Sequence, residues 1–360
     1  MSDLNFKNGT RNIRFRYDII RGLVRAGEAK VLDCTIRHNA DAKIKRTARL
    51  TLSGDGIDFL NDKIRAIVCI NGADYPVGTF IMSTPSEVGQ YYSVEAYDTT
   101  IILKEDCFTE RTFFAAGMRY DEVIAQIILG AGITDYNIPS IDVRLPADRE
   151  FEFGYCKLDA VNELLTEINY NPLVADALGR YTVTKYTAPK LSEANIEYFD
   201  GEFSVISSDM TSETDYYSVP NVFIARCDNP ELDATYFSTY VNDNPSSKLS
   251  TVSRGRRIVS EVFRPDYIAS QEALDEYVYR KAVERSAVYN KLEISTAIMP
   301  IHSYHDVLRV RCKGVDTVVL PDQSFTSPFE VNGIYLEKTW EMELKVGGKM
   351  THSLVGVHEI

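Results

Sequence analysis

The segment 302–306, His-Ser-Tyr-His-Asp, holds the residue types best suited to metal or acid–base chemistry. On a helix, His302 and His305 would share a face, and two imidazoles with a carboxylate form a common metal-ligand set. Pro300 precedes the segment, however, and a strand-like run, Asp306–Lys313, follows it. Positions three apart on an extended chain point to opposite faces. The other histidines have no partners at metal-ligand spacing: His38, His352 and His358. We therefore expect a structural loop at 302–306 and no metal.

Signatures of catalysis and of cofactor binding are absent from the sequence. There is no G-x-S-x-G, no cysteine in a recognisable nucleophile context and no phosphate-binding glycine loop of either common type. The 52 acidic residues include no pair that spacing singles out as glycosidase carboxylates. The densest basic spot, Arg254-Gly-Arg-Arg257, is typical of a solvated loop. We predict a protein that is not an enzyme, with no catalytic, cofactor-binding or metal-binding residues.

Length, composition and charge narrow the class of protein further. The chain has 360 residues, 44% hydrophobic and 25% charged, which suits about two globular domains. Its formal net charge of -13 repels nucleic-acid phosphates and anionic lipid. The polar start, MSDLNFKNGTRNIRFRYDII, has no apolar signal-peptide core, and no stretch is long enough to span a membrane. We expect a chain made in a cytoplasm, with no membrane contact.

The cysteines and the aromatic residues fit an intracellular, contact-forming protein. The six cysteines lie far apart without any C-x-x-C, so we expect free thiols, not disulfides or a zinc module. Twenty-two tyrosines accompany one tryptophan, Trp340. Tyrosine suits both strand packing and protein interfaces, so either reading of these residues stays open.

The first hundred residues alternate between apolar and polar side chains, as half-buried strands do. Asn71-Gly72 separates two such runs and accepts positive φ at low cost, which predicts a hairpin. The expected strands are Arg14–Ile20, Lys30–Arg37, Arg46–Leu52, Lys63–Ile70, Tyr75–Met82 and Tyr91–Tyr97. We predict a small antiparallel β-barrel over residues 1–104.

The character of the chain changes near Asp106. Tyr120–Gly130 and Lys157–Asn169 each place apolar residues on one helical face, while 144–153 and 180–186 look extended. We predict an inserted α+β domain over 105–190.

Strand patterns then resume and continue to Leu344. One helix interrupts them, over about 270–289, with Ser270 as its N-cap. The expected strands are Phe203–Met210, Val219–Cys227, Thr235–Val241, Arg257–Val262, Leu292–Met299, Asp306–Lys313, Val315–Leu320 and Val331–Leu344. We predict a second barrel over 191–345, a C-terminal tail over 346–360, and a fold that is mainly β, or α+β overall.

The order of these elements resembles the tail and baseplate hub proteins of bacteriophages, tailocins and contractile injection devices. The resemblance rests on three stretches: RFRYD with DCTIRHNADAKIKRTARLTL, then IRAIVCINGADYPVGTFIMSTP, then a strand ending at Tyr97-Asp98. The resemblance depends on the order of the strands and on the pattern PVGTF in the hairpin strand, Pro76–Phe80, within the second stretch. The resemblance covers nearly the whole chain and involves no catalytic residues.

The resemblance implies a structural protein of the virion tail. It implies a homotrimeric ring whose six similar barrels match a hexameric tail tube or distal tail protein, with a threefold spike or tip protein on the other face. A tape-measure protein is a further implied partner, and DNA is only a passing cargo, repelled by an acidic wall. Some hubs carry a peptidoglycan hydrolase, and since the chain ends at Ile360 we expect none here.

Two other functions remain open from the sequence. A tail-associated cell-wall hydrolase would use an acidic pair or the group His302, His305 and Asp306. A receptor- or glycan-binding tail adhesin would use exposed tyrosines as stacking surfaces.

Overall fold

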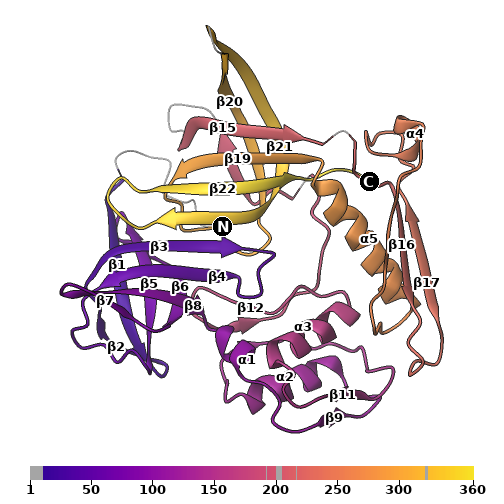
Figure 1. The fold of residues 1–360 in the computed structure, drawn as a ribbon, viewed down its shortest axis with the longest axis horizontal. Helices are drawn as coiled ribbons and strands as arrows, with labels where there is room; N and C mark the ends of the chain where they lie inside the picture. Colours follow the sequence, from indigo (N-terminus) through magenta and orange to yellow (C-terminus); the bar gives the residue numbers. More distant parts are fainter. Residues whose placement is uncertain (1–10, 192, 200–204, 216, 321–322) are drawn as a thin grey trace.

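Antiparallel strands make up most of the computed structural model, which describes residues 11–191, 193–199, 205–215, 217–320 and 323–360. Fourteen strands join in one extended sheet, and three smaller sheets flank it. Figure 1 shows the large sheet curling through the upper and left parts of the molecule, with the helices to the right and below. The predicted mainly β fold is confirmed.

The N-terminal strands form the first β region, and all six predicted strands are present. The bounds are β1 (Ile13–Arg21), β2 (Val24–Glu28), β3 (Val31–Asn39), β4 (Arg46–Leu52), β5 (Asp62–Ile70), β6 (Ala73–Met82), β7 (Ser86–Val88) and β8 (Tyr91–Asp98). They lie in the order β3-β4-β8-β6-β5-β1-β2, and β7 also pairs with β8. Asn71 and Gly72 have φ of 50° and 88°, so they make the predicted turn between β5 and β6.

The second β region is built from strands that are scattered along the C-terminal half. They are β14 (Ile196–Phe199), β15 (Ile206–Thr214), β19 (Asn290–Ala297), β20 (Val307–Leu320), β21 (Gln323–Glu343) and β22 (Lys349–Gly356). They lie in the order β14-β20-β21-β22-β19-β15. Residues 307–320, predicted as two strands, form the single strand β20. It pairs with β21 along its whole length, and the hairpin projects beyond the rest of the sheet (Figure 1).

The two β regions share their strand order. Taken in chain order, the strands of the first region match those of the second: β1, β3, β4, β5, β6 and β8 correspond to β14, β15, β19, β20, β21 and β22. With this correspondence, the order of neighbouring strands in the sheet is the same, β1-β5-β6-β8-β4-β3 in the first region and β14-β20-β21-β22-β19-β15 in the second. One pairing differs in direction: β1 is antiparallel to β5, whereas β14 is parallel to β20. The two strand-rich regions that the sequence predicts are therefore alike in strand order.

A direct strand pairing joins the two β regions. Thr339–Glu343 of β21 pair antiparallel with Thr35–Asn39 of β3, so the sheet continues from one region into the other. Beneath it, a single hydrophobic core takes residues from both regions, including Ile36 and Phe80 from the first and Leu292, Leu308 and Trp340 from the second. The two regions are thus packed as one body.

The insertion after β8 surrounds a second hydrophobic core, which is built mostly from its own residues together with Ile44. Its elements are α1 (Ile101–Glu105), β9 (Thr112–Phe114), α2 (Tyr120–Gly130), β10 (Tyr136–Asn137), β11 (Arg149–Phe151), α3 (Lys157–Glu167), β12 (Val174–Ala175) and β13 (Tyr181–Thr182). The predicted apolar faces of both main helices are buried: Val123, Ile124, Ile127 and Ile128 in α2, and Leu158, Val161, Leu164 and Leu165 in α3.

A second small unit interrupts the second β region between β15 and β19. It contains β16 (Val222–Cys227), β17 (Tyr236–Val241), α4 (Thr251–Arg254), β18 (Val259–Phe263) and α5 (Gln271–Ala287). The three strands form a separate sheet. The prediction that they belong to the second barrel is therefore wrong. The reason is that Phe223 and Ala225 of β16 pack on Leu274, Val278 and Ala282 of α5, so the helix, and not the large sheet, covers their apolar face.

Other sequence predictions have mixed outcomes. Residues 346–360, predicted as a tail, contain β22, an inner strand of the large sheet. All six cysteines lie within the described residues and none of them forms a disulfide, as expected. Phe203 and Ser204 of the predicted strand Phe203–Met210 lie outside the described residues. None of the described helices is long and apolar enough to cross a membrane. The domain boundaries stay a prediction.

Candidate functional site

The exposed face of the joined sheet is a surface that the two β regions build together. Residues pointing away from the core are polar there, because strand positions alternate between core and solvent. Glu341 of β21 lies opposite Arg37 of β3, and Arg49 of β4 lies opposite Glu95 of β8 with 3.6 Å between Nε and Oε1. A groove of about 710 Å³ crosses β15, β19, β22, β21 and β3. This face carries charges of both signs.

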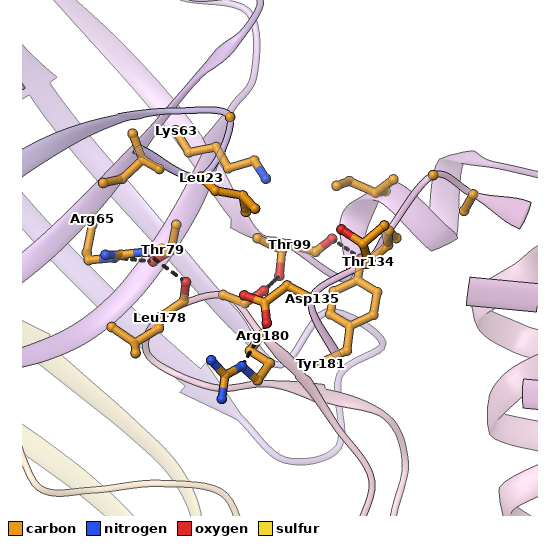
Figure 2. Close-up of a pocket in the computed structure, with 17 residues that line it drawn as sticks. Leu23, Lys63, Arg65, Thr79, Thr99, Thr134, Asp135, Leu178, Arg180 and Tyr181 are labelled. Atoms are coloured by element: carbon orange, nitrogen blue, oxygen red, sulfur yellow. Dashed lines mark hydrogen bonds and ion pairs between the residues drawn. The ribbon is translucent and has the colours of Figure 1, made fainter. Parts of the chain in front are cut away.

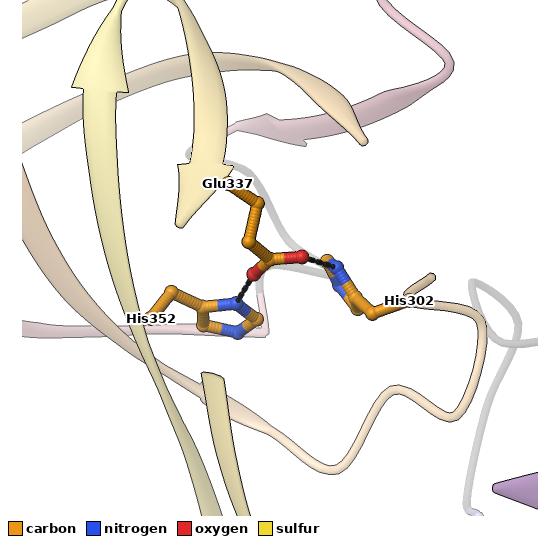
Figure 3. Close-up of side chains that lie close together, drawn as sticks. All are labelled: His302, Glu337 and His352. Carbon is orange, nitrogen blue, oxygen red and sulfur yellow. Dashed lines mark hydrogen bonds and ion pairs between the residues drawn. The ribbon is translucent and has the colours of Figure 1, made fainter. Parts of the chain in front are cut away.

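Beneath the second β region, His302, Glu337 and His352 form a fully buried cluster (Figure 3). The two oxygens of Glu337 divide between the rings: Oε2 lies 2.6 Å from His302 Nδ1, and Oε1 lies 2.5 Å from His352 Nδ1. On the far sides of the rings, His302 Nε2 lies 2.6 Å from the Tyr198 hydroxyl and His352 Nε2 lies 2.9 Å from Thr296 Oγ1. Every polar atom of the three side chains therefore has a partner.

Electrostatics keep the carboxylate of this cluster charged. Burial by itself raises the pKa of Glu337, but the two imidazoles outweigh it and lower the pKa to about 2. Burial lowers the pKa of His352, and burial also raises the pKa of Tyr198 well above its usual value. A carboxylate that can only accept assigns the Nδ1–H tautomer to both rings, and each ring then donates to Glu337. The cluster is a satisfied polar network in an apolar core.

The structure separates the sequence motif at 302–306. His302 enters the cluster, whereas His305 adopts a left-handed φ of 63° and stacks on Tyr304, with its pKa lowered to about 4 chiefly by burial. Asp306 closes the loop by accepting from the Ser303 backbone N–H at 2.6 Å and from Asn195 at 2.9 Å. The segment is therefore a loop. That no metal binds here stays a prediction.

Sequence reasoning missed two members of the cluster. His352 lies in β22 between Met350 and Leu354, which are both buried, so its alternation with them was the available signal. Glu337 follows the apolar run of β21 and showed no signal of its own. Elsewhere, the predicted solvated loop 254–257 begins with the last residue of α4, Arg254, which donates to the carbonyl of Val219 at 2.7 Å.

A cleft of about 630 Å³ lies between the first β region and the α+β insertion (Figure 2). Arg65 of β5 donates to Thr79 Oγ1 and to the carbonyl of Leu178, both at 3.0 Å. Thr99 donates to the carbonyl of Gly179 at 2.9 Å. A Cβ on Gly179, whose φ is 86°, would lie 3.0 Å from Thr99, so this close approach requires glycine. Hydrogen bonds between the polar groups of the cleft therefore connect the insertion to the first β region.

Comparisons with known proteins identify this architecture. No family model and no curated protein matches the sequence. Among solved structures, a tail protein from Neisseria meningitidis MC58 aligns with a TM-score of 0.62 at 10% identity, over 95% of this chain and 96% of that one. The 43 kDa tail protein of prophage MuSo2 from Shewanella oneidensis aligns with a TM-score of 0.60 at 12% identity, over 94% and 98%.

A third solved structure comes from a secretion system. It is the E. coli c3393 protein, a component of the type VI secretion system with structural similarity to T4 bacteriophage tail proteins gp27 and gp5. It aligns with a TM-score of 0.50 at 10% identity, over 97% of this chain and 77% of that one. The resemblance found in the sequence is thus confirmed at the level of the fold: this chain has the fold of phage tail proteins.

Proposed function

We propose that the chain is a structural hub of the tail of a phage or phage-like particle. Three copies form a ring that joins a hexameric tail tube to a threefold spike or tip protein. The observation that carries the proposal is the shared strand order of the two β regions. Three chains with two like regions each offer six similar surfaces, which is what a sixfold partner requires. The similarity of a related fold to gp27 and gp5 agrees with this role.

The pairing within one chain indicates how neighbouring chains would pair. In the first β region, β7 follows β6 and pairs with the same strand, β8, with Ser86 opposite Ser93. In the second β region, Thr339–Met342 of β21 pair with β22 in the corresponding way. On its other side, this part of β21 pairs with β3. The counterparts of β21 and β3 in the other β region are β6–β7 and β15. In the ring, β7 of one copy therefore pairs antiparallel with β15 of the next.

The outer edge of β15 is open to such pairing. β15 ends the large sheet, and no strand in the described ranges pairs with the outer side of 211–214. The backbone N–H of Asp215 donates to Tyr289 at 2.8 Å. Because hydrogen bonding alternates along an antiparallel strand, the N–H of Ser212 then points outward.

Light scattering on the purified protein, alone and with the tube protein of the same particle, tests the proposal. We expect a trimer with the tube protein present. Ser212→Pro removes the outward N–H while leaving the pairing with β19, so this variant should remain a monomer. Ser212→Thr keeps the N–H and is the matched control, which should assemble. Wild-type protein that stays monomeric with tube protein would contradict the ring, and a trimeric Ser212→Pro variant would contradict the β7–β15 pairing.

A further inference from the structure

A separate cavity of about 350 Å³ lies where the first β region, the α+β insertion and the loop 300–304 meet. The first β region contributes His38, Lys45 and Arg46, and the insertion contributes 174–177 together with Thr182 and Thr184. The exposed face of the sheet and the predicted ring contacts lie elsewhere, so this cavity is independent of the proposed assembly.

Arg46 places in the wall of this cavity a guanidinium to which no described side chain bonds directly. Its side chain is 7% exposed, and within the described part of the chain its guanidinium makes no hydrogen bond or ion pair, with Nε fully enclosed. The ring of Trp340 lies 5.6 Å away. Leaving a buried cation without a partner is costly, so native proteins supply a counter-charge.

Three carboxylates lie near the Arg46 guanidinium: those of Asp98, Asp176 and Asp306. Asp98 accepts from the backbone N–H of Arg46 at 2.8 Å and from Thr100. Asp176 accepts from the backbone N–H groups of Leu178 and Arg180, both at 2.9 Å. They attract the guanidinium through space but do not bond to it.

Two further donors line the same cavity. His38 is 2% exposed and stacks on Trp340, and neither of its ring nitrogens has a hydrogen-bond partner among the described residues. Lys45 donates to the carbonyls of Ala40 and Ala42 at 2.9 and 2.7 Å, which leaves one of its three hydrogens. A guanidinium, an imidazole N–H and an ammonium group together match the several acceptor oxygens of an oxyanion.

We infer that this cavity binds a small oxyanion, a carboxylate or a phosphate, held by the Arg46 guanidinium and the His38 ring. The planar guanidinium donates to two oxygens side by side, and a monatomic anion cannot supply two such acceptors. Since the cavity borders three parts of the chain, the bound anion ties them together and stabilises the folded protein.

Titration calorimetry and thermal unfolding of the full chain test this site. Sodium phosphate and sodium acetate are the probes, with sodium chloride at matched ionic strength as the reference. We expect saturable binding and a rise in Tm with at least one of the two oxyanions. Chloride should neither bind nor raise the Tm. Arg46→Gln should weaken binding at least tenfold. Arg49→Gln, on the exposed face of the same strand, is the matched control and should bind as the wild type does.

A second variant guards against misfolding of Arg46→Gln. His38→Phe keeps the stacking on Trp340 but removes the N–H, so it should weaken oxyanion binding several-fold while Arg46 stays intact. Wild-type protein that binds neither oxyanion, or that responds equally to chloride, overturns the inference. Equal binding by wild type and Arg46→Gln overturns it as well.

Discussion

Glu337 is a buried carboxylate that remains ionised because two imidazole N–H groups face its oxygens. Glu337→Gln replaces two charge-assisted hydrogen bonds and turns an amide NH₂ toward a ring N–H. We expect a loss of about 3 kcal/mol in the free energy of unfolding at pH 7.5, measured by urea denaturation. Glu341→Gln, on the exposed face of the same strand, is the control and should change stability by less than about 0.5 kcal/mol. Equal effects of the two variants would contradict the role of the cluster.

Buried histidines make the stability of this protein sensitive to acid. Burial lowers the pKa of His38 to about 3 and that of His305 to about 4, below the ordinary value of 6.5. The unfolded chain binds these protons first, so stability is full above pH 6.5 and falls as the pH drops toward 4. Each of the two histidines should lower the free energy of unfolding by up to about 1.4 kcal/mol for every pH unit of acidification in this window.

The pH dependence has its own control variant. His305→Asn keeps a residue type that tolerates the left-handed backbone at this position and removes the titrating ring. Urea denaturation at pH 7.5, 6.0 and 5.0 should therefore show a shallower loss of stability for His305→Asn than for the wild type. Parallel pH curves for the two proteins would show that His305 is not the source.

At the scale of single elements, α5 begins where its sequence predicted. Ser270 is the N-cap, and its hydroxyl accepts from the backbone N–H of Ala273 at 3.1 Å. Ser270→Ala removes this bond from the first turn and should lower the free energy of unfolding by about 1 kcal/mol. Ser260→Ala, in the exposed strand β18, should have little effect. A drop in thermal stability only for Ser270→Ala confirms the cap.

The whole molecule bears on the choice between a structural protein and a cell-wall hydrolase. The histidine cluster is fully buried and all its polar atoms are paired, so a peptidoglycan strand has no access to it. We expect no clearing in a zymogram on bacterial cell walls, with lysozyme as the positive control. A lytic band from the wild type that disappears in Glu337→Gln would contradict the structural role.

Local patterns in the sequence determined most of the elements. The alternation in Arg46–Leu52 and the helical spacing in Tyr120–Gly130 reproduce β4 and α2 to the residue, because solvent on one side and core on the other impose these periods on any such segment. The Asn71-Gly72 turn and the Ser270 cap were likewise predictable, since each depends only on its own few residues.

Tertiary structure alone decided which distant elements pair and which side chains from them meet. β3 pairs with β21, which lies about three hundred residues later in the chain. The packing of α5 on β16 places β16–β18 in a sheet of their own, separate from the large sheet. His302, Glu337 and His352 come from a loop and two strands, and Arg46 meets its cavity only where three parts of the chain converge. Such contacts depend on strand register and on packing between segments far apart in the chain. A local period in the sequence does not specify either of them.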